Sequence, residues 1–474
     1  MKSLAIIGAG PKALAVQAKL HALRSLGVPT PEVTVLDPHG IGGNWKPCGG
    51  WTDGRQLLGT SPDKDLGFPY RTRIAGELNE AVDRSMLGLS WVRFLTESDR
   101  YASWIDRGHP NPPHYLWASY LEWAAQKMGM RVVPATVRLL DVTTESSATS
   151  PTGTATGTAS QPCRWRLTAE DTRGAEFTLE ADSVLVTGPG RSDGKISDVP
   201  GVLSVAEFWD LKARGSLPEV PRVVVIGTGE SAASVLDQLI HLNIEEALAV
   251  SPLATMFSRG ESQFENELYN ELYTDPRKWV TLSEAARRDF IRRTDRGVLS
   301  VRVQQVLDSD DRVAHRRGVV RRVELASSPD ADFRLRVHID DEVCGSYTEL
   351  CDLVIDARGG RLLWFCDVMT PQVRLLLERA LGNQSDAALS SVPAWEASIG
   401  ADLAVEGLVP HLFVPALAGM RQGPGFANLS CLGELSDRVV AGLGVGDGLG
   451  DNAADVQAGM RAGVQAGVRA EVRS

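Results

Sequence analysis

Two short glycine-rich strings in distant parts of the chain contain the residue types that bind the diphosphate of a dinucleotide. Each string follows an apolar run typical of a buried strand and opens a segment with the apolar spacing of a helix. Glycines there permit a tight turn and a close backbone approach, and the helix N-terminus supplies N–H donors and a positive dipole end. We assign to this role Gly8, Gly10, Pro11 and Ala13 in the first string, and Gly227, Gly229 and Ser231 in the second. One such string is weak evidence, whereas two favour two nucleotide sites over structural turns.

The strand expected after each string indicates which nucleotide binds there. After the first string, this strand ends in Asp37, an acid that suits the unphosphorylated ribose of FAD or NAD. The alternative for Asp37 is an acid in a strand-end turn. After the second string, the strand ends in Ser251, and Ser258 and Arg259 follow. This pattern favours the ribose 2′-phosphate of NADPH over NADH, with a solvated surface charge as the alternative for Arg259.

Two strings of this kind imply an α/β protein with two Rossmann-like dinucleotide-binding domains, one for FAD and one for NADPH. We expect the FAD-binding domain to begin with 1–205 and to be completed by 351–441, with the NADPH-binding domain inserted at 206–350. The segment 144–161 is rich in Ser and Thr and almost lacks large apolar residues, which predicts a flexible insertion. The Gly- and Ala-rich segment 442–474 is expected to be a flexible tail.

The overall composition excludes several classes of protein. The chain has 474 residues, of which 43% are hydrophobic and 23% charged, as is typical of a globular protein with two or three domains. Its net charge of −11 disfavours nucleic acid and anionic membranes as partners, and no run is apolar enough to span a bilayer. Six scattered cysteines without a CxxC pair predict neither disulfides nor zinc, and the eight histidines lack metal-type spacing. We therefore expect a soluble, cytoplasmic protein without a metal.

A flavin and a nicotinamide cofactor in one chain suggest a hydride relay between them. A disulfide reductase would need a cysteine pair beside the flavin, and the sequence contains no CxxC string. A flavin monooxygenase passes one oxygen atom of O₂ to a substrate, and it needs mainly a dry pocket around the flavin. The residues alone therefore favour a monooxygenase.

Longer strings point in the same direction through a family resemblance. They lie at 49–54, 58–65, 67–70, 104–108, 258–261, 264–266, 293–298, 423–426 and 428–433. On these strings the chain resembles the flavin-dependent N-hydroxylating monooxygenases of siderophore biosynthesis, most of all the lysine N6-hydroxylases of mycobactin biosynthesis. The resemblance covers nearly the whole chain apart from the Ser/Thr-rich insertion and the tail. It implies that NADPH reduces FAD, that the reduced flavin activates O₂, and that a neutral amine receives the oxygen.

The resemblance also implies three residues that bind the amino acid substrate. In the wider family, a lysine in a string ending Lys-Asp-Leu binds the substrate carboxylate, and Lys64 matches it. An asparagine after Ser-x-Phe-x holds the substrate backbone, and Asn266 matches that position. The position beside the substrate amine holds Asp295 where the ornithine enzymes have an asparagine. An acid pairs with an ammonium but also keeps it protonated, so Asp295 either pairs with an arginine or docks the amine before proton loss. The alternatives are a surface lysine at Lys64 and a helix cap at Asn266.

Two further groups of residues are candidates for contact with the flavin. Trp45 and Trp51 are candidates to pack over the flavin and exclude water, with core filling as the alternative. The turn around Gly425, with Asn428 and Leu429 after it, precedes a helical run. We expect the N-terminus of that helix to face the flavin, with a plain loop-to-helix start as the alternative.

These features predict an enzyme that uses NADPH and O₂ to hydroxylate the N6 amine of L-lysine, or of a lysine-containing siderophore precursor. Ornithine or a diamine is an alternative substrate, because one methylene changes binding by only about 1–3 kcal/mol. A sulfur or carbonyl oxygenase of the same flavin class is another alternative, and so is a nucleotide-binding regulator without turnover. The sequence leaves open whether the lysine is free or acylated, and whether the protein is a homo-oligomer.

Overall fold

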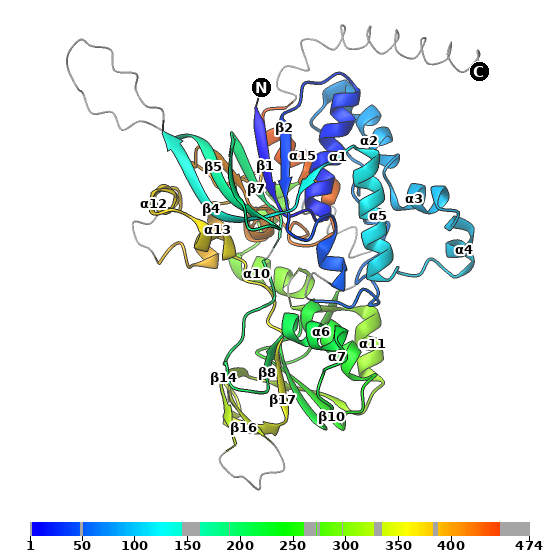
Figure 1. The fold of residues 1–474 in the computed structure, drawn as a ribbon, viewed down its shortest axis with the longest axis vertical. Coiled ribbons are helices and arrows are strands. Elements are labelled where there is room, and N and C mark those ends of the chain that lie inside the picture. The colour runs from blue at the N-terminus through cyan, green and yellow to red at the C-terminus, as the bar shows by residue number, and fades with distance from the viewer. Residues whose placement is uncertain are drawn as a thin grey trace, which may run out of the picture.

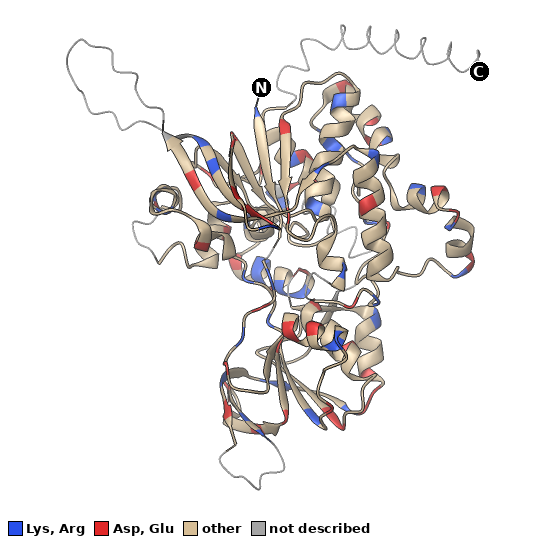
Figure 2. Cartoon of the chain, viewed as in Figure 1, with Lys and Arg blue, Asp and Glu red and all other residues tan. Residues whose placement is uncertain are grey.

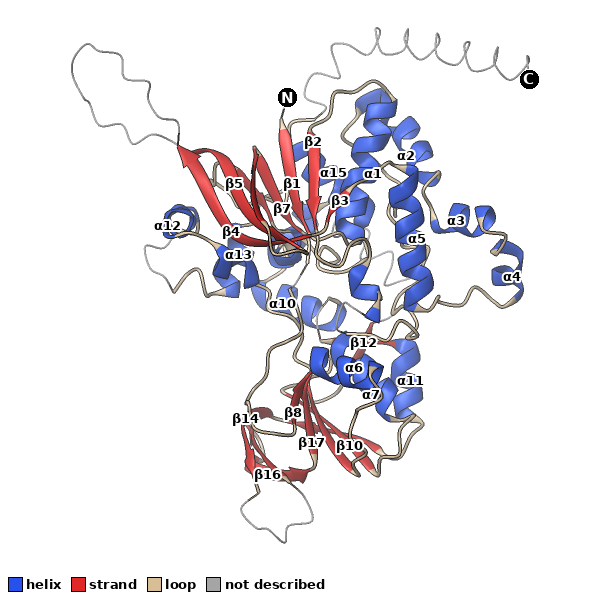
Figure 3. Cartoon of the chain, viewed as in Figure 1, coloured by secondary structure: helices blue, strands red, loops and turns tan. Residues whose placement is uncertain are grey.

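The computed structural model describes most of the chain as an α/β protein with two parallel sheets (Figures 1 and 3). The described residues are 2–47, 51–144, 162–188, 190–259, 272, 275–295, 297–326, 334–382 and 387–445. Residues 145–161 of the expected insertion and 446–474 of the expected tail lie outside them, as does Asn266. The predictions for these residues therefore stay predictions.

The first sheet contains the first glycine string and has the strand order β18-β7-β1-β2-β3, with every pair parallel. The chain runs from β1 to β2 and β3 on one side, and it later adds β7 and β18 on the other. The order therefore reverses beside β1, where open α/β sheets bind ligands at the carboxyl ends of their strands. The strands are β1 (Ser3–Ile7), β2 (Glu32–Leu36), β3 (Val132–Val133), β7 (Ser183–Val186) and β18 (His411–Phe413).

Helices and a small antiparallel sheet enclose the first sheet in one apolar core. Helix α1 (Pro11–Ser25) packs against α15 (Leu432–Gly442), and both lie on one side of the sheet in Figure 1. The antiparallel sheet of β4 (Ala135–Thr144), β5 (Pro162–Asp171) and β6 (Glu176–Ala181) lies on the other side. Because both faces are covered, β1 is apolar along almost its whole length rather than alternating.

The second sheet contains the second glycine string and has the strand order β13-β10-β9-β17-β8, again with every pair parallel. Its order reverses beside β9, so the second string also lies at a switch point of a sheet. Residues on successive positions of β9 pack into two different cores, as the two-residue period of a strand requires. The strands are β8 (Val202–Ser204), β9 (Arg222–Ile226), β10 (Glu246–Ser251), β13 (Val313–Arg317) and β17 (Leu353–Asp356).

Helices cover one face of the second sheet and an antiparallel sheet covers the other. The helices are α6 (Val205–Ala213), α7 (Glu230–Leu239) and α11 (Val301–Asp308). The antiparallel strands are β14 (Val319–Leu325), β15 (Leu335–Asp341) and β16 (Gly345–Cys351). The first and second sheets therefore belong to two separately cored units, which Figure 1 shows one above the other. Acidic and basic residues are interspersed over both units (Figure 2).

The remaining elements surround these two units. The helices are α2 (Asn79–Leu87), α3 (Trp91–Glu97), α4 (Tyr101–Asp106), α5 (His114–Lys127), α9 (Pro276–Val280), α10 (Glu284–Thr294), α12 (Pro371–Ala380), α13 (Val392–Ser398) and α14 (Gly419–Gln422). Short 3₁₀ helices cover Gly43–Trp45, Gly76–Leu78, Trp364–Val368 and Pro415–Leu417. Strands β11 (Phe257–Arg259) and β12 (Val298–Ser300) pair with each other in parallel.

The strand pairings correct the expected points where the chain crosses between the units. Strand β8 precedes residue 206 but pairs with β17, and β17 follows residue 350 but pairs with β9. Strands β8 and β17 thus belong to the second sheet, although the expected boundaries at 205/206 and 350/351 assign both to the first unit. The physical reason is that a buried apolar strand fits either parallel sheet, and only the pairing selects one.

Candidate functional site

The first glycine string forms a tight turn between β1 and α1. Gly8 has φ +101°, and a Cβ on it would overlap the hydroxyl of Thr187, which follows β7. Gly10 is the N-cap residue of α1, and Pro11 is the first helical residue. Within the described residues, this helix end has no side-chain cap hydrogen bond. The N-terminus of α1 therefore follows a glycine turn without a side-chain cap, which is the geometry of a diphosphate-binding turn.

A cavity of about 670 Å³ opens at the carboxyl ends of the first sheet's strands. Its size suits a large, elongated ligand better than an amino acid alone. Seven of the predicted cofactor residues line it, namely Gly8, Gly10, Pro11, Asp37, Trp45, Asn428 and Leu429. The lining also contains residues that sequence reasoning missed, among them Lys12, Arg138, Thr187, Arg191, Arg361 and Trp364. Of these, only Lys12 had a sequence signal, because it stands inside the glycine string.

Asp37 lies at the end of β2 and is both a cavity wall and a turn residue. Its carboxylate accepts hydrogen bonds from the backbone N–H of Ala9 and of His39, each at 2.8 Å. The first bond ties Asp37 directly to the glycine string. A carboxylate can accept about four hydrogen bonds, so it retains capacity for a ribose hydroxyl. The two interpretations of Asp37 are therefore compatible.

Three other predicted residues of the first site, Ala13, Trp51 and Gly425, lie outside the cavity lining. Ala13 is completely buried in α1, where the fingerprint needs a small residue for helix–strand packing. Trp51 packs against the apolar core of the second sheet, and its ring lies 5.0 Å from that of His114. Of the two tryptophans, Trp45 lines the cavity and Trp51 does not, although their rings lie 6.2 Å apart. The reason is tertiary, because an ion pair between Asp53 and Lys212 of α6 holds this loop toward the second unit. That the two tryptophans pack over a flavin stays a prediction.

The turn around Gly425 differs from the expected helix start. Helix α15 begins only at Leu432, and its early N–H on Gly433 donates to the carbonyl of Phe68 at 2.7 Å. The Gly433 N–H is therefore bonded to protein backbone, and no residue of α15 is in the lining of the cavity. Asn428 and Leu429, which precede the helix, line the cavity instead.

The second glycine string repeats the geometry of the first. Gly227 has φ +121°, and a Cβ on it would lie 2.6 Å from the carbonyl oxygen of Ala357 after β17. Gly229 is the N-cap of α7, again without a side-chain cap from the described chain, and Ser231 stands in the first turn of that helix. The N-terminus of α7 therefore offers a second diphosphate-binding turn.

The residues predicted to contact a 2′-phosphate follow this second string. Ser251 ends β10 and is buried, with its hydroxyl 3.1 Å from Nε2 of His315 on the neighbouring strand β13. Ser258 lies half-buried on β11, opposite Leu299. Arg259 ends the same strand, and its side chain lies outside the description. The structure thus places Ser251 at the carboxyl end of β10, beside the strand that precedes the second glycine string, and the roles of all three residues stay predictions.

Lys64 lies in a buried turn that is fixed by its neighbour Asp65. The Asp65 carboxylate accepts hydrogen bonds from the Tyr70 hydroxyl at 2.6 Å and from the Trp91 N–H at 2.8 Å. Burial raises the pKa of Asp65 to about 7, although these hydrogen bonds lower it. Lys64 itself is only 8% exposed, so the alternative of a surface lysine is wrong. An ammonium in such surroundings is suited to binding a carboxylate.

The turn that carries Lys64 passes beside the second glycine string. A Cβ on Gly59 would lie 2.9 Å from a carboxylate oxygen of Glu230, the first residue of α7. The two units therefore meet where one supplies Lys64 and the other supplies the N-terminus of α7. This proximity follows from tertiary packing and has no signal in the sequence.

Asp295 directly follows α10 and contacts the segment that lines the cavity. Its carboxylate accepts hydrogen bonds from the backbone N–H of Gly425 at 2.9 Å and from the side-chain amide of Asn428 at 3.3 Å. Arg296, a candidate partner for Asp295, lies outside the described residues. The structure thus brings Asp295 together with two predicted cofactor residues.

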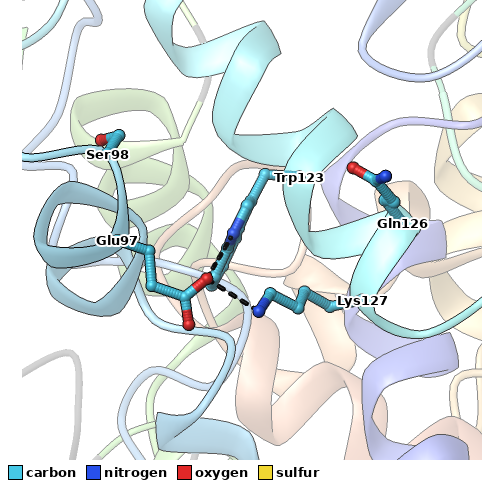
Figure 4. A pocket seen from close by; sticks show the side chains of 5 residues that line it. All are labelled: Glu97, Ser98, Trp123, Gln126 and Lys127. Atoms are coloured by element: carbon cyan, nitrogen blue, oxygen red, sulfur yellow. Dashed lines mark hydrogen bonds and ion pairs between the residues drawn. The ribbon is translucent and has the colours of Figure 1, made fainter.

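A second pocket carries no chemistry of this kind. A surface pocket between α3 and α5 is lined by Glu97, Ser98, Trp123, Gln126 and Lys127 (Figure 4). Its polar groups satisfy each other, since Glu97 accepts from the Trp123 ring N–H at 3.1 Å and pairs with Lys127 at 2.7 Å.

Within the described part of the chain, no cluster of His, Cys, Asp and Glu could hold a metal. None of the helices described there is long and apolar enough to cross a membrane.

Comparison with known proteins identifies the family. A family model for L-lysine 6-monooxygenase/L-ornithine 5-monooxygenase matches residues 87–310. The L-lysine N6-monooxygenase MbtG of Mycobacterium sp. (strain MCS) is 43% identical over 442 residues, which cover 92% of this chain and 94% of that protein. The chain belongs to the L-lysine 6-monooxygenase/L-ornithine 5-monooxygenase family. It is accordingly a flavin-dependent monooxygenase.

A second relative and a solved structure agree with the family assignment, and a more distant structure shares the fold. MbtG of Mycobacterium tuberculosis (strain CDC 1551 / Oshkosh) is 41% identical over 445 residues, covering 92% of this chain and 94% of that protein. The solved structure of the lysine monooxygenase NbtG from Nocardia farcinica is 42% identical, with a TM-score of 0.76, and covers 92% of this chain and 98% of that one. Ornithine hydroxylase PvdA from Pseudomonas aeruginosa, at 18% identity and a TM-score of 0.65, covers 94% of this chain and 98% of that one. PvdA shares the fold, which confirms the expected α/β architecture.

Proposed function

We propose that this protein is an L-lysine N6-monooxygenase that uses FAD, NADPH and O₂ in the biosynthesis of a hydroxamate siderophore of the mycobactin type. The observation that carries the proposal is the similarity to proteins named L-lysine N6-monooxygenase, which are 41–43% identical over 92–93% of this chain. The buried Lys64, in the string that matches the substrate-binding lysine of the family, supports it. Ornithine or a diamine is the alternative substrate, since one methylene changes binding only modestly.

The residues of the first site fit FAD. A diphosphate would bind at the glycine string, where a Cβ on Gly8 has no room and the N-terminus of α1 carries no side-chain cap. Asp37 would hold a ribose hydroxyl, and Trp45, Asn428 and Leu429 would line the rest of the cofactor. When bound, a flavin supplies the redox chemistry that activates O₂. We accordingly propose that the unit around the first sheet is the FAD-binding domain.

The residues of the second string fit NADPH. The N-terminus of α7 offers the same kind of turn, and Ser251 ends the strand where an acid would exclude a 2′-phosphate. A related structure, NbtG, has an NADPH domain, and the ornithine N-hydroxylase of Kutzneria sp. 744 is a complex with reduced FAD, NADP⁺ and L-ornithine. We propose that the unit around the second sheet binds NADPH.

The protein's own residues would prepare the amino acid for oxygen transfer. Lys64 would bind the substrate carboxylate and thereby fix the distance from that end to the reacting amine. The buried surroundings of Lys64 would exclude water, which otherwise diverts reduced flavin and O₂ to peroxide. The amine must lose its proton before it reacts, since only the neutral form is a nucleophile. The proposal therefore predicts that turnover with lysine rises with pH in the mildly alkaline range.

Cys344, Cys351, Cys366 and Cys431 are free thiols, which supports a reducing, cytoplasmic location. Small molecules, namely O₂ and lysine or a lysine derivative, are the expected partners, and the net charge of −11 argues against nucleic acid.

The decisive experiment compares NADPH oxidation with hydroxylamine formation for several amines in parallel. The substrates are L-lysine, L-ornithine, cadaverine and an acyl-lysine. We expect the highest hydroxylamine yield per NADPH with lysine. A higher yield with ornithine or cadaverine would move the substrate to the alternative. Oxygenation of a thioether or ketone without any amine would assign a different oxygenase, and a flavin that stays oxidised under anaerobic NADPH would assign a regulator.

A further inference from the structure

A short segment between α14 and α15 forms one wall of the large cavity. Within it, Gly425 has φ +96° and closes a turn by accepting the N–H of Asn428 at 3.3 Å. Asn428 and Leu429 line the cavity directly, as does Ala427. The position of this segment therefore determines which atoms face a bound cofactor.

Two buried charges from different parts of the protein hold this segment. Lys12, on the glycine string, donates from Nζ to the carbonyl of Ala427 at 2.9 Å. Asp295, at the end of α10, accepts from the N–H of Gly425 at 2.9 Å and from Nδ2 of Asn428 at 3.3 Å. Lys12 is 7% and Asp295 9% exposed. Buried charges are costly unless hydrogen-bonded, so these contacts favour one position of the segment.

The contacts of Asn428 also fix the orientation of its side-chain amide. An ionised carboxylate can only accept hydrogen bonds, so Asp295 must face the Nδ2 group of Asn428. The other end of the amide, Oδ1, accepts from the N–H of Ser430 at 2.8 Å. Asp295 thereby selects one of the two amide orientations at the cavity wall. A neutral side chain at this position would not make that selection as strictly.

We propose that Asp295 is a positioning residue for the flavin cofactor, which holds the 425–428 segment in place, rather than a residue that binds the substrate ammonium. This inference deepens the proposed function and rests on its assignment of the large cavity to FAD. It also removes a chemical difficulty, because a carboxylate paired with the substrate amine would stabilise the protonated, unreactive form. Helix α10 packs against α14, which precedes the 425–428 segment. The contact of Asp295 therefore connects this segment to the end of α10.

The test compares Asp295→Ala and Asp295→Asn with Asp289→Ala as the matched control. Asp289 lies on α10 with its side chain 42% exposed, and among the described residues it pairs only with Arg292 and Arg293. For Asp295→Ala we expect FAD to dissociate about tenfold more readily, as the loss of a charged hydrogen bond implies, with a shifted visible spectrum of the bound flavin. The KM for lysine should change less than about threefold. Asp295→Asn should shift the spectrum less, because its carbonyl still accepts from Gly425.

Two outcomes would overturn the inference. An unchanged flavin spectrum and FAD affinity, together with a lysine KM raised about tenfold, would return Asp295 to the substrate amine. Unchanged values of all three quantities would show that the contacts position nothing. If Asp295→Ala does not fold, Asp295→Asn and the cavity variant Asn428→Ala supply the same measurements. The flavin spectrum and the FAD affinity can be measured without NADPH or lysine. A wild-type holoenzyme that binds FAD but does not hydroxylate lysine would therefore contradict the proposed function without contradicting this inference.

Discussion

At the scale of single residues, Lys64 has the most direct role in the proposed reaction. We expect Lys64→Ala to raise the KM for lysine about 10- to 100-fold, because a charge-assisted hydrogen bond to a carboxylate contributes about 1.5–3 kcal/mol. Hydroxylamine yield per NADPH should fall more than NADPH oxidation, since a misplaced amine leaves reduced flavin to form peroxide. The measurement is hydroxylamine, peroxide and NADPH in one reaction, with the exposed Lys127→Ala as control. Equal yield per NADPH at saturating lysine would contradict the assignment.

Asp65 carries a prediction about stability, because burial raises its pKa to about 7. A carboxyl group with a raised pKa in the folded state keeps its proton at pH values where the unfolded chain loses it. Its stabilising contribution is therefore complete below the ordinary pKa near 4, and it is lost as pH rises toward about 7. Over that range the free energy of unfolding should fall by up to about 1.4 kcal/mol per pH unit on account of Asp65.

The variant Asp65→Asn isolates this contribution, because it cannot titrate. We expect the difference in unfolding free energy, wild type minus Asp65→Asn, to decrease between about pH 4.5 and pH 7. Urea unfolding of both proteins at several pH values measures it. A difference that stays constant with pH would mean that Asp65 is ionised throughout, with an ordinary pKa.

At the scale of elements, the turn between β1 and α1 decides whether the first site can form. We expect Gly8→Ala to be purified without FAD, because the new Cβ overlaps the Thr187 hydroxyl and the residue has φ +101°. The backbone strain costs about 1–3 kcal/mol, and it would distort the part of the backbone that approaches the diphosphate. FAD per chain, from absorbance and protein concentration, is the measurement.

The matched control for this turn is Gly27→Ala, in the turn that follows α1. Gly27 has φ +83°, but a Cβ on it meets nothing within 4 Å. Gly27→Ala should lose stability by a similar strain while retaining FAD. Loss of FAD from both variants would show that destabilisation, rather than the close approach at Gly8, removes the cofactor.

At the scale of the whole molecule, the two units meet at the loop that carries Trp51 and Asp53. Asp53 forms an ion pair with Lys212 of α6, and the Trp51 ring packs on the core of the second sheet. We expect Asp53→Asn and Lys212→Met each to increase peroxide formed per NADPH, because a looser contact between the units admits water. The double variant should be no worse than either single variant, with a coupling of about 0.5–3 kcal/mol in unfolding free energy.

A suitable control for this contact is Lys195→Met, because Lys195 pairs with Glu207 on α6 itself. It removes a similar ion pair at the same helix, although Lys195 itself lies before β8 and not on α6. Peroxide formation should remain at the wild-type level in this variant. Additive effects of the Asp53 and Lys212 substitutions would contradict a direct coupling between the units.

The sequence by itself determined the local features of this protein. The two glycine strings, the strands before them and the helices after them follow from residue type and spacing, because a tight turn needs glycine and a helix N-terminus binds anions. The family followed from long strings such as 58–65 and 423–426. Lys64 was predicted from such a string and Asp37 from its place at the end of the second expected strand, and the roles of both stay predictions.

Only the tertiary structure decided which residues meet across large distances in the chain. It placed β8 and β17 in the second sheet, turned Trp51 toward α7, and brought Asp295 to Gly425 and Asn428. No local pattern encodes such choices, because a buried strand fits either sheet and a charged side chain can find its partner anywhere. Pairing, packing and the cost of burying a charge settle them together when the whole chain folds.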